Sequence, residues 1–71
     1  MNASRSETFQ NWFFRQLEQQ FDKRGKMVNT VCSTLNLGRD AVYRRLRGDT
    51  SLTADELLTL ARKFNIQLDD E

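Results

Sequence analysis

The feature that most constrains the fold is an interruption between two short apolar patterns at positions 36 to 38. Asn36 and Gly38 are residue types that tolerate a positive φ, and they flank the apolar Leu37. A turn of this composition can bury the leucine inside the corner between two helices. The segment that follows carries four arginines before Gly48, against one acidic residue. The sequence therefore predicts two helices that meet at a tight turn, of which the second is strongly basic.

Length and composition favour one small all-α domain over residues 1–71. The 71 residues include five phenylalanines and one tryptophan but no proline, and strand signals are weak throughout. One cysteine and no histidine argue against an internal disulfide and against the usual zinc or haem ligand sets, so no metal or cofactor is expected. The chain also lacks paired carboxylates around a plausible pocket and a nucleotide-binding glycine loop. We therefore expect no enzymatic activity.

Apolar residues at helical spacing predict four helices, at about 6–22, 27–35, 39–46 and 54–64. In the first helix, aromatic and aliphatic residues recur at every fourth position: Phe9, Phe13, Leu17 and Phe21. Ser4 and Ser6 are rival N-caps for its start, and Gly25 is expected to end it. The aromatic stripe is expected to form the core.

The other three helices differ in how clearly the sequence indicates their ends. The second helix has no evident polar cap near Met27, and its β-branched residues lower its helix propensity, so packing must hold it. Gly48 closes the third helix. The fourth has Thr53 as its N-cap and Glu56 three residues later, which predicts a capping box. Asn65 can take the left-handed position beyond the end of this helix.

Charge is distributed unevenly along the chain, although the formal net charge is only +1. Arginines dominate the third helix, whereas acidic residues crowd the segments that follow it, including the C-terminal end. A polarised surface of this kind fits a protein that touches a polyanion with one face only. A solvated helix face is an equally good interpretation of charge alone.

From Lys26 to Phe64 the sequence resembles the lambda-repressor-like, or Cro/C1/Xre-type, helix-turn-helix family of bacterial and phage regulators. The resemblance rests on apolar residues at the family's buried positions, on the turn and on the end of the third helix with the helix that follows: Val31, Cys32, Leu35, Leu37, Val42, Arg47-Gly48, and Leu52 through Phe64. It implies a small bundle of four to five helices in which the helix at 39–46 enters the major groove of DNA.

Several positions depart from the family pattern. The family usually has glycine at the position of Asn36, serine or threonine at Gly38, and a polar cap near Met27. The first two changes preserve backbone geometry, because asparagine tolerates the left-handed conformation and glycine can cap a helix. An inward-facing position of the family falls on Arg45, with Leu46 apolar instead. The rotation of the third helix, or the shape of its last turn, is therefore left open.

In the resembled family the start and outer face of the third helix read base edges, which maps onto Arg39, Asp40, Tyr43 and Arg44. A guanidinium can donate to both guanine acceptors, O6 and N7, so Arg39 and Arg44 are the strongest candidates. Asp40 can accept from cytosine N4, but orienting an arginine or stabilising the helix start is its expected role. Tyr43 can contact a thymine methyl or a phosphate, or it can cover the edge of the core.

Phosphate contacts in the resembled family come from the start of the second helix and from the loop after the third. Together with one arginine of the third helix, these segments supply the candidate phosphate ligands: Lys26, Asn29, Arg45, Arg47, Thr50, Ser51 and Thr53. Such contacts set the register on DNA and add little sequence preference. Thr53 can instead serve only as a helix cap, and Thr50 and Ser51 can simply solvate a loop. For Arg45 two roles are open: a contact with the DNA backbone and an intramolecular ion pair.

The resemblance implies a sequence-specific domain of a transcriptional regulator that binds double-stranded DNA as a homodimer. The single cysteine and the lack of an apolar signal core predict a cytoplasmic location. No membrane association is expected, because no apolar stretch approaches the length of a span. One recognition helix covers only a few base pairs, so usable specificity generally needs two half-sites. The uncapped acidic end at 69–71 is typical of a domain followed by a further C-terminal region. The alternative is a protein-interaction module that binds an acidic or helical partner through its arginine face.

Overall fold

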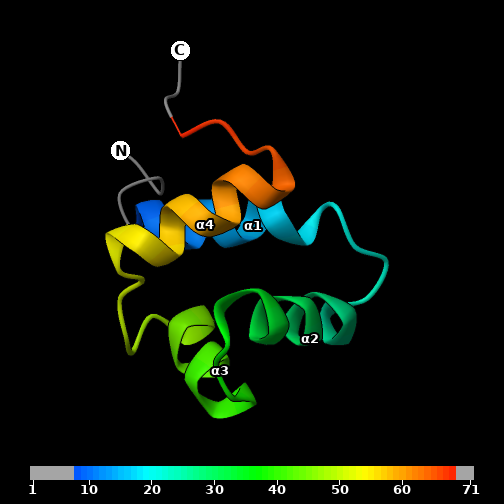
Figure 1. Ribbon diagram of the computed structural model, residues 1–71, viewed down its shortest axis with the longest axis vertical. Coiled ribbons are helices and arrows are strands. Elements are labelled where there is room, and N and C mark those ends of the chain that lie inside the picture. The colour runs from blue at the N-terminus through cyan, green and yellow to red at the C-terminus, as the bar shows by residue number, and fades with distance from the viewer. Residues whose placement is uncertain (1–7, 69–71) are drawn as a thin grey trace, which may run out of the picture.

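Four helices account for most of residues 8–68, which are the residues described by the computed structural model (Figure 1). Their bounds are α1, Phe9–Glu18; α2, Arg24–Leu35; α3, Arg39–Arg47; and α4, Ala54–Phe64. Helices α1 and α4 lie at one end of the molecule, and α2 and α3 lie at the other (Figure 1). No strand is present within 8–68, which confirms the all-α prediction for this part of the chain.

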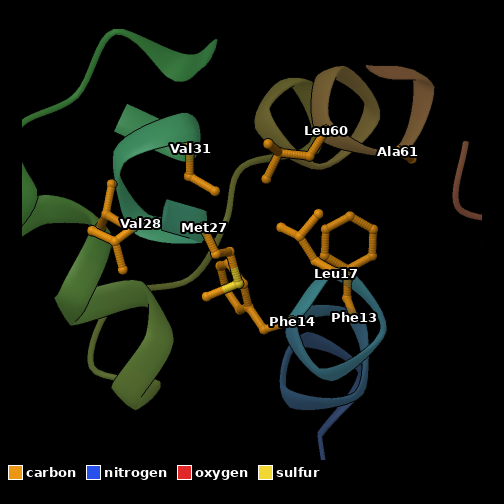
Figure 2. Close-up of a cluster of buried hydrophobic side chains, with 9 residues drawn as sticks. Phe13, Phe14, Leu17, Met27, Val28, Val31, Leu60 and Ala61 are labelled. Atoms are coloured by element: carbon orange, nitrogen blue, oxygen red, sulfur yellow. The ribbon is translucent and has the colours of Figure 1, made fainter. Parts of the chain in front are cut away.

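The core lies between α1, α2 and α4 (Figure 2). The largest side chains with no exposed surface are Phe13 and Leu17 from α1, Met27 from α2 and Leu60 from α4. Full burial of a side chain of this size contributes about 1.5–3 kcal/mol to the free energy of folding. Helix α3 adds a single buried residue, Val42. The exposed residues of α3 are Arg39, Asp40, Arg44 and Arg47, and the others are buried or half-buried.

Helix α1 is shorter than the predicted span of 6–22. It begins after Thr8, whose hydroxyl accepts a hydrogen bond from the Asn11 N–H at 3.1 Å, while the rival caps at 4 and 6 lie outside the described residues. It ends at Glu18, and the chain then turns so that the ring of Phe21 packs against that of Phe64, with centroids 5.7 Å apart. This contact between distant segments explains why the apolar pattern continues beyond the end of the helix.

Helix α2 begins three residues earlier than predicted. Gly25, which the sequence indicated as the end of the first helix, lies in the first turn of α2. The carbonyl of Lys23 accepts from the N–H groups of Lys26 and Met27 at 3.1 and 3.3 Å, which closes that turn. No side chain caps the start of α2, in agreement with the absence of a capping residue in the sequence.

The turns around α3 and α4 largely follow the sequence prediction. Asn36, Gly48 and Asn65 all have left-handed backbone conformations, with φ of 58°, 85° and 56°. Gly38 does not: its φ of −76° is extended, and it acts as the N-cap residue of α3. The predicted capping box at the start of α4 is confirmed, with both of its reciprocal hydrogen bonds present.

Candidate nucleic-acid interface

Helices α2 and α3 are joined by a three-residue turn that fixes how α3 is presented. The carbonyl of Cys32 accepts from the N–H groups of both Asn36 and Leu37, and the carbonyl of Gly38 accepts from Val42 at 3.2 Å. Leu37 packs against the core, as predicted for the corner of the turn. Since Val42 is fully buried, the opposite side of α3 points away from the rest of the molecule.

The outward side of α3 carries all four residues that the sequence analysis assigned to base reading. We define the basic face as five residues of α3 at helical spacing, all of them exposed except the half-buried tyrosine: Arg39, Asp40, Tyr43, Arg44 and Arg47. Positions three, four and seven apart lie on the same side of a helix, so these side chains are neighbours. Three guanidinium groups and one carboxylate give this face a net positive charge.

Arg39 is held in place by two neighbours. Its guanidinium donates to Oδ1 of Asn29 on α2, and it lies 5.7 Å from the centroid of the Tyr43 ring, an arrangement typical of a cation–π contact. A longer contact of 3.4 Å joins Arg39 to the Tyr43 hydroxyl. Asn29, a candidate phosphate ligand, is therefore engaged with Arg39. The structure brings these three candidate residues together across the α2–α3 junction.

Arg44 and Asp40 differ from Arg39 in having no such partner. Neither side chain makes a hydrogen bond or an ion pair with any residue of 8–68, and both are exposed. Asp40 lies in the first turn of α3, where a carboxylate interacts favourably with the helix dipole. Of its expected roles, stabilisation of the helix start fits this placement, whereas orientation of an arginine does not.

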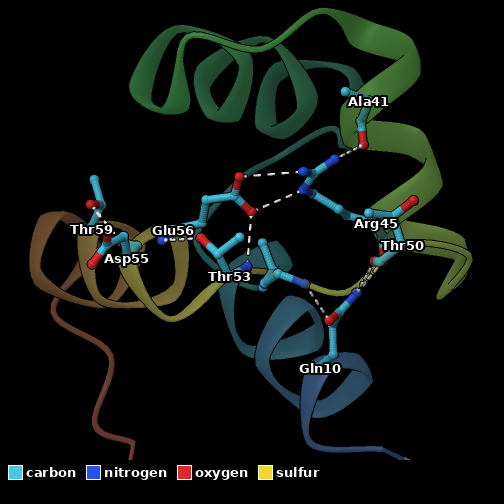
Figure 3. Close-up of polar contacts among 9 residues, drawn as sticks. Gln10, Ala41, Arg45, Thr50, Thr53, Asp55, Glu56 and Thr59 are labelled. Carbon is cyan, nitrogen blue, oxygen red and sulfur yellow. Dashed lines mark hydrogen bonds and ion pairs between the residues drawn. The ribbon is translucent and has the colours of Figure 1, made fainter.

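Arg45 points away from the basic face, toward α4 (Figure 3). Its Nε and Nη2 donate to the two carboxylate oxygens of Glu56 at 3.0 and 3.3 Å, and its Nη1 donates to the carbonyl of Ala41 at 2.9 Å. The side chain is only 13% exposed. Of the two alternatives for Arg45, the structure shows the intramolecular ion pair, so we leave this residue out of the proposed contact set.

The ion pair also sets the ionisation of Glu56. Partial burial alone raises the pKa of a carboxyl group, because it penalises the charged form. Hydrogen bonds from Arg45 and from the Thr53 N–H, together with the charge of Arg45, outweigh burial and lower the pKa of Glu56 below its ordinary value. One carboxylate thus completes the capping box of α4 and neutralises the inward-facing arginine of α3.

The remaining candidate phosphate ligands surround the ends of the two helices. Arg47 forms an exposed ion pair with Asp49 at 3.0 Å, and an exposed pair of this kind contributes little stability. Thr53 accepts from the Glu56 N–H and so acts as the helix cap. Ser51 is exposed, with no hydrogen bond to any described residue.

Lys26 and Thr50 complete this set. Lys26 is exposed at the start of α2, one helical turn before Asn29 and therefore on the same side of that helix. Its side chain makes no hydrogen bond or ion pair within 8–68. Thr50 is half-buried, and its carbonyl accepts a hydrogen bond from Gln10 of α1 at 2.9 Å. Lys26 thus extends the basic surface from α3 toward α2, whereas the backbone of Thr50 is tied to the rest of the molecule.

Sequence reasoning missed Gln10, which makes one hydrogen bond to the last turn of α3 and two to the segment between α3 and α4. It also missed Glu56 as the partner of Arg45, although a charged residue at an inward-facing helix position is itself a signal that a counter-ion lies nearby. No comparable local signal marks Gln10, because its partners are backbone groups at least 35 residues away.

No group of three or more histidine, cysteine, aspartate or glutamate side chains is arranged to hold a metal ion in 8–68. Within the same range, no helix combines the length and apolar character that crossing a bilayer requires.

Comparison with family models, curated proteins and solved structures found no match to this chain.

Proposed function

We propose that the protein is a sequence-specific, double-stranded DNA-binding domain of a transcriptional regulator with a lambda-repressor-like fold of the Xre type. Helix α3 docks in the major groove, and the activity involves no catalysis. The observation that carries the proposal is the presentation of α3: a tight turn and one fully buried valine leave the whole basic face outward. A helix exposed in this way has the shape and charge to enter a duplex groove.

The contacts that each residue makes within the protein suggest its role in DNA binding. Arg39 and Arg44 contact base edges, where a guanidinium can donate to guanine O6 and N7 together. Lys26, Arg47 and Ser51 contact phosphates and set the register of the protein on the duplex. Asn29 and Tyr43 hold the Arg39 guanidinium in place before binding. The Arg39 side chain therefore loses less conformational entropy when it binds DNA.

We propose that the protein binds DNA as a homodimer in the cytoplasm. Two recognition helices that read half-sites one helical turn apart must lie about 34 Å from each other. The extents of the molecule are 37 × 26 × 24 Å, so two copies placed side by side across either shorter dimension fit this spacing without overlap. These dimensions support two copies on adjacent half-sites.

A salt titration tests the proposal. Affinity for a random-sequence duplex, measured by fluorescence anisotropy, should fall steeply with salt, with a slope of log K against log [salt] between about −2 and −4 for two to four phosphate contacts. An acidic peptide of the same net charge serves as competitor. Preferential binding of the peptide, with a shallow salt dependence on DNA, would instead favour the protein-interaction module.

A further inference from the structure

The side-chain amide of Gln10 ties α1 to the segment that follows α3 (Figure 3). Its Nε2 donates to the carbonyls of Arg45 and Thr50 at 2.8 and 2.9 Å, and its Oε1 accepts from the N–H of Leu52 at 2.8 Å. Both bonds donated by the amide nitrogen and one accepted by the amide oxygen are thus made with backbone groups. One side chain fixes a segment that lies 35 to 42 residues away along the sequence.

Two of these bonds straddle Ser51 and determine how its peptide groups are turned. The C=O and N–H of a trans peptide point in opposite directions, because the group is planar, and no cis peptide is present within 8–68. The carbonyl of Thr50 points at Gln10, so the N–H of Ser51 in the same peptide points away from it. Gln10 therefore fixes the direction of this backbone donor.

Ser51 offers the one unpaired backbone N–H between 48 and 53. The N–H groups at 48, 49 and 50 donate to the carbonyls of Arg44 and Arg45 at the end of α3. Those of Leu52 and Thr53 donate to the side chains of Gln10 and Glu56. The Ser51 hydroxyl likewise has no partner among the described residues, and Ser51 and Arg47 border the same hollow. A free backbone N–H, a free hydroxyl and the guanidinium of Arg47, which pairs with Asp49 in the unbound protein, suit a phosphate oxygen.

We propose that Gln10 is a positioning residue for DNA binding, which holds Ser51 so that its N–H and hydroxyl face the phosphate backbone. This inference rests on the proposed function. Gln10 lies on α1, outside α2 and α3, and its amide is consumed by contacts within the molecule. It therefore acts on DNA affinity through the backbone that it holds, which is the last turn of α3 and the loop after it.

The test compares Gln10→Ala with Gln16→Ala, which changes a half-buried glutamine of the same helix whose side chain makes no hydrogen bond within 8–68. Affinity is measured on a duplex enriched from a random pool and on a random duplex. Gln10→Ala should bind both about tenfold more weakly, the cost of losing a hydrogen bond to a charged group, with their ratio unchanged. Gln16→Ala should match the wild type on both. Amide hydrogen exchange at Leu52 should accelerate only in Gln10→Ala.

A double-mutant cycle shows whether the effect passes through Ser51. Ser51→Ala should lower affinity by itself, and Gln10→Ala should then cost less than in the wild type, because the two residues serve one contact. Gln10→Glu keeps the acceptor for Leu52 but places a carboxylate oxygen against the carbonyls of Arg45 and Thr50, so its affinity should fall at least as far as that of Gln10→Ala. Full additivity in the cycle would overturn the inference.

The outcomes separate this inference from the function on which it rests. A wild-type protein that binds neither duplex refutes the proposed function. A wild type that binds DNA, with a folded Gln10→Ala that binds equally well, overturns the positioning role alone. Loss of helical circular dichroism in both Gln10 variants also overturns it, because Gln10 would then serve the stability of the bundle.

Discussion

The two arginines proposed to read bases differ in how strongly their side chains are restrained. Arg39 is restrained by Asn29 and Tyr43, whereas Arg44 makes no hydrogen bond or ion pair within the described range. A restrained guanidinium loses less conformational entropy on binding, while a free one can adapt to the base that it meets. Arg44 is therefore the better residue for a clean mutational test, since its removal disturbs no contact within 8–68.

Replacing Arg44 by alanine should cost roughly 1–3 kcal/mol of binding free energy on the enriched duplex and relax the preference at one base. Thermal stability should change by no more than about 0.5 kcal/mol, because the residue is exposed and unpaired. Arg62→Ala, on the exposed surface of α4, is the matched control and should leave affinity unchanged. Equal weakening of Arg44→Ala on enriched and random duplexes would count against base reading.

The Arg45–Glu56 pair makes a separate prediction about pH. The folded state lowers the pKa of Glu56, so it binds the Glu56 proton less readily than the unfolded chain does. The resulting stabilisation is present above the ordinary pKa, about 4.3, and is lost as the pH falls through the lower folded value. At pH 7, Glu56→Gln should lower the free energy of unfolding by about 1–3 kcal/mol. Below about pH 4, denaturant titrations should show a smaller difference in the free energy of unfolding between Glu56→Gln and the wild type.

Glu18→Gln supplies the control for this prediction. Glu18 pairs with Arg24 at 3.2 Å, but both side chains are well exposed, so its removal should cost less than about 1 kcal/mol. A Glu56→Gln protein as stable as Glu18→Gln at neutral pH would show that the Arg45–Glu56 pair is not a significant contributor to stability.

At the scale of single residues, the sequence predicted local contacts and missed distant ones. The capping role of Thr53 depends on a residue three positions away, and it is confirmed. The partners of Gln10 and Arg45 lie on other elements, so their identification required the arrangement of the helices. Local hydrogen-bonding rules carry no information about which segments meet in space.

At the scale of helices and turns, boundaries with a local cause were predicted best. Asn36 and Asn65 end α2 and α4 in left-handed conformations, as their residue type favours. The early end of α1 was not predictable from spacing, because Phe21 keeps the apolar pattern while packing on Phe64. Gly25 was misassigned because glycine is typical of helix ends yet is tolerated in a first turn.

Two glycine substitutions should have opposite effects on stability. At Gly48 an added Cβ would meet no atom within 4 Å, but the φ of +85° is strained for any other L residue, so Gly48→Ala should cost about 1 kcal/mol. Gly25 has helical backbone and equally open surroundings, so Gly25→Ala should stabilise by about 0.5–1 kcal/mol. Each 1 kcal/mol should shift Tm by about 4–8 °C in calorimetry. Shifts of the same sign in both variants would contradict the assigned backbone conformations.

At the scale of the whole molecule, the fold places α3 at the end opposite α1 and α4 (Figure 1). The apolar pattern predicted an all-α fold and the α2–turn–α3 unit, and both are observed within residues 8–68. How α3 is rotated was left open by the sequence. The structure resolves it: Val42 is buried, Leu46 is half-buried, and Arg45 is turned toward α4 through its partner Glu56.

Selection of duplexes from a random-sequence pool tests most directly the claim that α3 reads DNA sequence. The account predicts that repeated rounds enrich one motif, composed of two related half-sites whose centres lie about 10 base pairs apart. The same selection with a protein carrying both Arg39→Ala and Arg44→Ala should lose the motif while retaining weak, salt-sensitive binding. A pool that stays random after selection by folded wild-type protein would contradict the account.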